Sequence, residues 1–160
     1  MALIFDFCAI RREREYAALV RERDTLRKTL RQPTATSPPY ATLWRLHEIE
    51  KRLWILAHEM HADLTAQSVL NSGKLCVTAL GTIETELREH DHGGPKFGPA
   101  VAKKAVATAS AIYSDFMERM TALALGIVPA TPTERDRISH LAKLSGEGYA
   151  RILRGVSPPS

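Results

Sequence analysis

Aromatic residues and cysteines are both scarce in this sequence: aromatics make up 6% of its 160 residues, and there are two cysteines. β-Sheets favour aromatic and β-branched side chains, whereas Ala, Leu, Arg and Glu, which are abundant here, suit helices. We therefore predict an all-α fold. The hydrophobic content of 44% fits a folded chain of about one domain that can bury a core.

The two cysteines, Cys8 and Cys76, lie far apart and belong to no C-x-x-C motif. Both are set among apolar neighbours, so we expect reduced, buried thiols. Long hydrophobic runs are missing too. The initial MALIFDFCAI is too short to span a bilayer, carries Asp6, and is followed by its positive charges, where a signal peptide has them first. We expect a cytoplasmic protein with no membrane partner.

Catalytic motifs are also missing. The sequence has no G-x-S-x-G, P-loop or Rossmann glycine fingerprint, and SGKL at Ser72–Leu75 matches only the tail of a P-loop. Carboxylates such as Glu48 and Glu50 are spaced by two, which turns them to different faces of a helix. We predict that the protein is not an enzyme and needs no cofactor.

Basic charge is what the sequence does have, with a net charge of +4. Residues 11–31 hold eight basic and four acidic residues, and residues 134–154 hold five basic and three acidic ones. Both ends are therefore basic around a nearly neutral middle. Such ends attract phosphates or form an ordinary solvated face.

Proline and hydroxyl residues in RQPTATSPPYAT separate a charged helix from the rest of the chain. We predict an antiparallel helical bundle with a long charged N-terminal helix and a short C-terminal helical hairpin. The expected divisions are the charged helix in 1–31, a Pro-rich linker in 32–41, the bundle core in 42–128, and the hairpin and tail in 129–160.

The clearest pattern is an apolar seam whose members recur at steps of three and four. Its residues are Leu43, Leu46, Ile49, Leu53, Leu56, Met60 and Leu64. This spacing is typical of a core-facing helix or of a coiled-coil pairing. We interpret the seam as a self-association surface, so the expected partner is a second copy or another protein.

NSGK at Asn71–Lys74 is expected to bend or break the second helix. Glycines and prolines in EHDHGGPKFGP then predict a turn before an Ala-rich helix over Pro99–Leu125. The buried face expected for that helix comprises Val101, Ala105, Ala109, Ile112, Phe116, Met120 and Leu123.

The last helix begins with a strong local signal. Thr131 suits the N-cap, Pro132 the first helical position and Glu134 the third, which together form a capping box. We expect this helix to end near Leu144, with Gly146 in the left-handed position after it. A short helix would then follow.

Histidines offer the only metal hypothesis. His58 and His61 would share a helix face, and EHDH places two more beside the glycine turn. Solvated histidines are the competing interpretation, because HEMH is not H-E-x-x-H and the single Glu-x-x-His falls at the turn. The candidate ligands are His58, His61, His90 and His92.

Two basic segments predict nucleic-acid contacts. Lysines in GGPKFGPAVAKK cluster where a helix begins, where free amide groups attract anions, although an ordinary solvated turn is the favoured interpretation of this loop. LAKLSG and ARILRG near the C-terminus resemble repressor-type helix-turn-helix domains, with a recognition segment shorter than the family pattern. The candidate contact residues are Lys96, Lys103, Lys104, Lys143, Arg151 and Arg154.

A second resemblance covers GGPKFGPAVAKKA to ALGIVPATPTERDRI, which is similar to the C-terminal half of some phage small terminase subunits. The matching residues are Pro99, Ala100, Gly126, Pro129 and Arg135. We infer no family membership from them.

These observations predict a non-enzymatic helical binding or adaptor protein that self-associates and contacts nucleic acid through its basic ends. The first alternative is an assembly subunit whose N-terminal helix reaches over a neighbour. The second is a metal-dependent helical enzyme built on the histidines.

Overall fold

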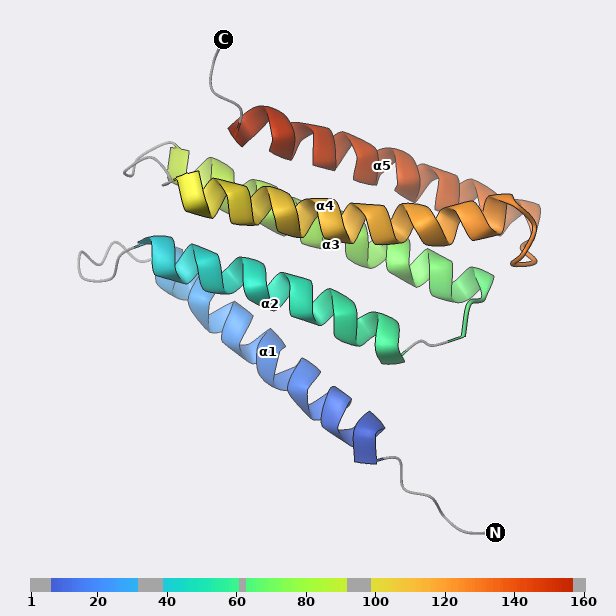
Figure 1. Cartoon of the computed structure of the whole chain (residues 1–160), viewed down its shortest axis with the longest axis horizontal. Helices are drawn as coiled ribbons and strands as arrows, with labels where there is room; N and C mark the ends of the chain where they lie inside the picture. The colour runs from blue at the N-terminus through green and yellow to red at the C-terminus, as the bar shows by residue number, and fades with distance from the viewer. Residues whose placement is uncertain (1–6, 32–38, 61–62, 92–98, 157–160) are drawn as a thin grey trace.

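The computed structural model describes residues 7–31, 39–60, 63–91 and 99–156. These residues form five helices and no strand (Figure 1). In chain order they are α1 (Phe7–Arg31), α2 (Pro39–Met60), α3 (Ala66–Asp91), α4 (Pro99–Ala124) and α5 (Pro132–Val156). The predicted all-α helical bundle is confirmed. None of the five described helices is long and apolar enough to cross a bilayer.

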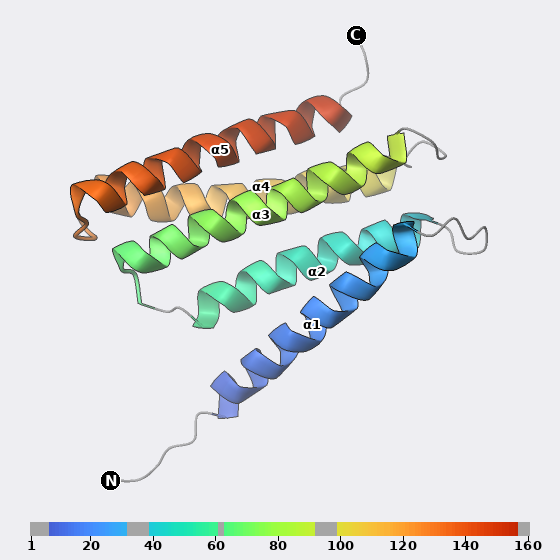
Figure 2. The same cartoon turned by 180° about the vertical axis from the view of Figure 1, so that it is seen from behind.

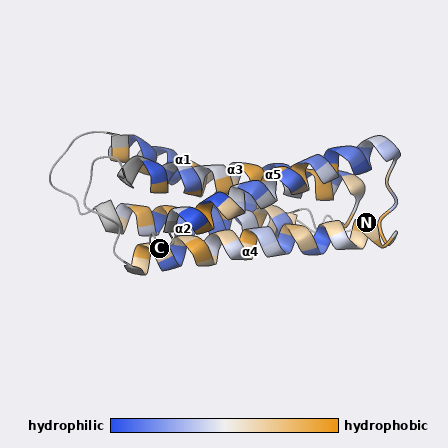
Figure 3. Ribbon diagram, turned by 90° about the horizontal axis from the view of Figure 1, so that it is seen from above, coloured by the Kyte–Doolittle hydropathy of each residue, from blue (hydrophilic) through white to orange (hydrophobic). Residues whose placement is uncertain are grey.

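Consecutive helices run antiparallel, and α3 and α4 lie at the centre of the bundle (Figures 1 and 2). Helix α3 contacts α2, α4 and α5, whereas the backbone of α1 approaches α2 alone. Helices α1 and α5 therefore lie on opposite sides of the molecule. Both hydrophilic and hydrophobic residues appear along the helices in Figure 3, as expected where each helix buries one face.

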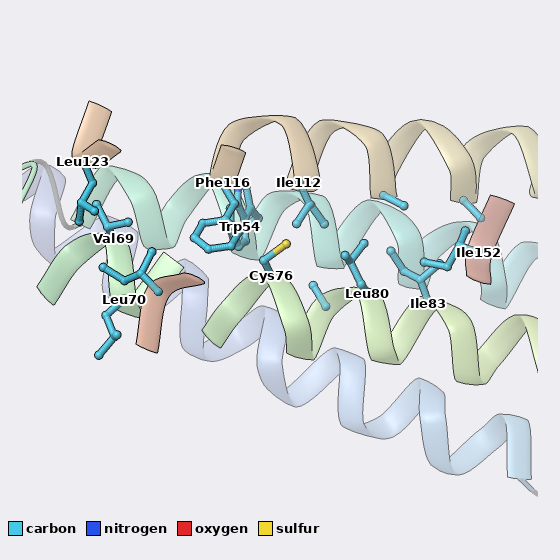
Figure 4. Close-up of a cluster of buried hydrophobic side chains, with 14 of the residues drawn as sticks. Trp54, Val69, Leu70, Cys76, Leu80, Ile83, Ile112, Phe116, Leu123 and Ile152 are labelled. Carbon is cyan, nitrogen blue, oxygen red and sulfur yellow. The ribbon is translucent and has the colours of Figure 1, made fainter. Parts of the chain in front are cut away.

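The main hydrophobic core is formed by α3, α4, α5 and Trp54 of α2 (Figure 4). The buried face predicted for the Ala-rich helix is confirmed at Val101, Ala105, Ala109, Ile112, Phe116 and Leu123. Met120 is partly buried and packs against this core.

Cys76 is buried as expected, but Cys8 is exposed near the start of α1, so its predicted burial is wrong.

The apolar seam is also buried, and it is buried within one chain. Leu43, Leu46, Ile49, Leu53 and Leu56 are between 0% and 4% exposed. Met60 ends α2, and Leu64 lies beyond the helix with 39% of its surface exposed. The seam is thus shorter than its spacing suggested, and its buried members already have neighbours inside the chain.

The predicted break at Asn71–Lys74 is wrong, because α3 continues through it. A Cβ atom on Gly73 would lie 2.8 Å from Cζ of Phe116 and 3.0 Å from Cδ1 of Leu141. Gly73 therefore serves close packing, since only a residue without a side chain lets α4 and α5 come this near.

The true start of α3 lies earlier, at a cap that the sequence pattern did not reveal. The Ser68 backbone N–H donates to Oγ1 of Thr65 (3.1 Å), and the Thr65 N–H donates to Oγ of Ser68 (2.8 Å). This is a capping box with Ser at the third helical position in place of Glu.

The predicted capping box of the last helix is confirmed. The Glu134 N–H donates to Oγ1 of Thr131 (3.2 Å), and the Thr131 N–H donates to a Glu134 carboxylate oxygen (3.0 Å). Helix α5 begins at Pro132. Gly126, with a φ of 78°, ends the preceding helix in the left-handed conformation.

The C-terminal helical hairpin is not formed, because α5 is one continuous helix of 25 residues. Gly146 lies inside it, where a Cβ would approach the Tyr113 hydroxyl at 3.4 Å. Burial of Ile152 in the core, with Tyr149 packed against it, holds this segment helical, which outweighs the cost of about 1 kcal/mol for a helical glycine. The resemblance to a helix-turn-helix therefore fails at its turn.

Two glycines of α3 provide a matched test of this packing. Gly73→Ala should destabilise the protein by about 1–3 kcal/mol, because Leu141 and Phe116 must move. Gly81→Ala should stabilise it by up to about 1 kcal/mol, because a Cβ there meets nothing within 4 Å. Urea unfolding of both variants measures the difference. Equal effects would contradict the close approach at Gly73.

Candidate binding surface on helix α1

Helix α1 is attached to the bundle differently from the other four helices. Between Phe7 and Leu30 it has no buried side chain, and it contributes none to the main core. Its apolar residues Tyr16, Leu19, Leu26 and Leu30 are only partly buried.

Two bidentate ion pairs join α1 to α2. Arg52 donates to both carboxylate oxygens of Glu15 (2.7 and 3.1 Å), and Arg45 donates to both oxygens of Glu22 (2.8 and 2.9 Å). These hydrogen bonds lower the pKa values of both glutamates. The two glutamates are seven residues apart on α1, and the two arginines are seven residues apart on α2. The two ion pairs therefore lie along one line between the antiparallel helices.

Helix α1 also contributes three arginines that point toward the bundle. Arg12 lies 3.3 Å from Glu59. Arg23 lies 3.7 Å from Glu50, whose side chain is buried. Arg27 reaches past α2 to buried Glu86 of α3 at 3.5 Å.

The outward face of α1 is left with positive charge. Arg11, Arg14, Arg21 and Lys28 are exposed, and none has an ion-pair partner within the described residues. Their spacing of three, seven and seven residues keeps them on one face. At 1.5 Å per residue this basic stripe is about 26 Å long. Asp24 lies beside the stripe, three residues after Arg21 and four before Lys28, and is 3.5 Å from Arg23. Glu13 is also exposed on α1, so the exposed charges of the helix keep a positive excess but not an unbroken one.

The basic residues selected from the sequence form no comparable surface. Arg151 donates to Glu84 at 2.9 Å, and Lys104 lies 3.9 Å from Glu48 and over the ring of Trp44. Lys103, Lys143 and Arg154 are exposed on α4 and α5. Lys96 lies outside the described residues.

The histidine metal hypothesis gains no support. His58 is occupied by hydrogen-bonding neighbours, while His61, His92 and the side chain of His90 lie outside the described residues. Among the residues that the structure describes, no three His, Cys, Asp or Glu side chains converge on a point that could hold a metal ion.

A polar cluster that sequence spacing did not reveal joins α2, α3 and α4. His58 Nδ1 lies 2.7 Å from Oδ2 of Asp115, and His58 Nε2 lies 3.3 Å from Oγ of Ser72. The Trp54 indole N–H donates to the same Asp115 oxygen at 2.9 Å. The hydrogen bond with His58 is the main reason that the pKa of Asp115 is lowered.

Ser72, His58 and Asp115 have the order of a catalytic triad but lack its surroundings. Ser72 is only 4% exposed and lies within α3. Backbone N–H groups at that position bond along the helix, so they supply no oxyanion hole. We interpret the cluster as a structural link between three helices.

Comparison with known proteins adds no identity: no family model matches this chain, and no curated protein or solved structure matches it.

The cluster around Asp115 predicts a pH-dependent loss of stability. Asp115→Ala should cost about 1–3 kcal/mol at pH 7, because Trp54 and His58 lose a hydrogen-bond acceptor. The folded-state pKa of Asp115 is depressed, so its contribution is full above the unfolded value of about 3.8. It is lost as the pH falls through the folded value. Urea unfolding at pH 7 and pH 3 should show the gap between variant and parent shrinking, and a constant gap would refute this role.

Glu50 should make the stability of the protein depend on pH in the opposite direction. Burial raises its pKa to about 7, outweighing the opposing effects of Arg23 and Arg27. The folded protein therefore holds this proton to a higher pH than the unfolded chain does, and stability falls as the pH rises from about 4.5 to 7. Glu50→Gln should be more stable than the parent by up to about 3 kcal/mol at pH 8 and nearly equal to it at pH 4. Unfolding free energies at these two pH values test this, and an advantage that does not grow with pH would count against it.

Proposed function

We propose that this protein is a non-enzymatic helical nucleic-acid-binding protein that contacts phosphates through the basic stripe of α1. Helices α2–α5 are the scaffold. The observation that carries the proposal is the division of charge on α1, where the inward glutamates are used by arginines of α2 and the outward cations are left without partners.

The chemistry of the stripe suits a phosphate backbone. Arginine guanidinium groups bind phosphate oxygens in a bidentate manner, and Lys28 adds a point charge. A straight row about 26 Å long can follow several phosphates of one strand. Phosphate contacts carry no sequence information by themselves, so the proposed binding is independent of base sequence.

The position of α1 supports access to a large polyanion. It is the outermost helix on its side of the bundle (Figure 1). Among the described helices its backbone approaches α2 alone, so none of the other three described helices packs on the face turned away from α2.

Binding to a labelled duplex of arbitrary sequence, measured by fluorescence anisotropy at several salt concentrations, tests the proposal. Four phosphate contacts predict a slope of about −3.6 in log K against log salt. Arg14→Ala combined with Arg21→Ala should weaken binding and bring the slope to about −1.8.

The matched control removes the same charge elsewhere. Lys103→Ala combined with Arg154→Ala changes two exposed cations outside α1 and should leave the affinity nearly unchanged. Equal losses in the two double variants would show that net charge, and not the stripe, governs binding. Absence of salt-sensitive binding in the parent protein would overturn the proposal.

An assembly subunit is the second candidate function, and exposed apolar side chains favour it. Phe7, Leu125 and Ile127 are 77%, 71% and 69% exposed. Self-association through such residues would appear as a mass above 17.8 kDa in size-exclusion chromatography with light scattering. The buried part of the apolar seam would not take part unless the bundle opened.

A further inference from the structure

A groove of about 470 Å³ lies between α3 and α5, in a part of the molecule separate from α1. Leu70 and Leu141 contribute its apolar surface. Four charged or titratable side chains surround them, Lys74 from α3 and Asp136, Arg137 and His140 from α5. Because α5 and α1 lie on opposite sides of the bundle, this groove does not overlap the basic stripe (Figures 1 and 2).

The close contact at Gly73 explains why the groove forms here. Leu141 occupies the space that a side chain at position 73 would need. Leu70 and Lys74 flank this contact on α3, while Arg137 and His140 come four residues and one residue before Leu141 on α5. Basic groups from two helices are thereby drawn together over an apolar surface.

The charges around the groove are not neutralised by one another. Lys74, Asp136, Arg137 and His140 are exposed, and none makes an ion pair within the described residues. Most arginines that face the bundle are paired with carboxylates, as Arg45 and Arg52 are. Two permanent cations and a histidine against one carboxylate leave the groove with a positive excess.

We propose that the α3–α5 groove is a binding site for a small amphiphilic anion, a carboxylate or phosphate group carried on an apolar body. The anionic head lies between Lys74 and Arg137, and the apolar body covers Leu70 and Leu141. The volume falls in the range of about 300–1,000 Å³ that is usual for small-molecule sites. This site is independent of the proposed binding of nucleic acid to α1.

Methyl NMR titration of the full chain with three probes that share one ring system tests the site. The probes are 1-naphthoate, 1-naphthyl phosphate and the neutral 1-naphthamide. Both anions should shift the methyl signals of Leu70 and Leu141, and the amide should bind about tenfold more weakly because it lacks the charge. The stronger of the two anions identifies the preferred head group.

Lys74→Ala combined with Arg137→Ala should reduce the affinity for both anions about tenfold and leave that for the amide unchanged. Both residues are exposed, so the variant should keep the parent's unfolding free energy, which urea unfolding verifies. The same variant should bind the labelled duplex like the parent, which separates this site from the function proposed for α1.

Three results would overturn the proposal. The first is equal binding of the amide and the anions, and the second is an anion affinity that the double variant does not change. The third is the absence of shifts at Leu70 and Leu141 up to about 10 mM probe. Loss of duplex binding in the α1 variant, with normal naphthoate binding, would leave the groove assignment intact.

Discussion

The contact of α3 with α4 and α5 at Gly73 is the constraint on which much of this fold depends. Phe116 and Leu141 fill the space that a side chain on Gly73 would need, within a core to which all three helices contribute. The same contact requires α3 to be continuous where its sequence suggests a break. It also brings α5 close enough to α3 for their exposed side chains to border a common groove.

On the opposite side of the molecule, ion pairs join α1 to the bundle. Helix α1 has no fully buried side chain, and arginine and glutamate pairs, each of which contributes about 0.2–1 kcal/mol when exposed, join it to the bundle beside its partly buried apolar residues. Buried Glu50 and Glu86 extend this contact inward. Since Glu15 and Glu22 pair with arginines of α2, Glu13 and Asp24 are the acidic residues left exposed on this helix, against four exposed cations without ion-pair partners among the described residues.

Periodicity predicted the parts of the structure that depend on local pattern. The buried faces of α2 and α4 and the capping box at Thr131 follow from spacing, and the structure contains them. The glycines at 73 and 146 were misinterpreted because a glycine that ends a helix and a glycine that admits a neighbouring helix look alike in sequence. Only the position of Leu141 or Tyr113 distinguishes the two. The basic residues of the stripe could have been identified in the sequence from their spacing. Which of these cations remain unpaired depends on the register between α1 and α2, which the sequence pattern does not give. Ser72, His58 and Asp115 come from three different helices, so no local sequence pattern predicts that they form a cluster.

The two tryptophans of the chain stand in contrasting surroundings, which gives the protein two internal optical reporters. Trp54 is 5% exposed, donates its indole N–H to Asp115 and lies 4.2 Å from the His58 ring, measured between ring centroids. Trp44 is half-buried, donates its indole N–H to Glu48 and has the Lys104 ammonium over its ring. Emission from Trp54 therefore reports on the joining of α2 to α4 within the core, while emission from Trp44 reports on the more exposed contact between the first halves of the same two helices. Unfolding that begins at one end of this helix pair can thus be followed by tryptophan fluorescence.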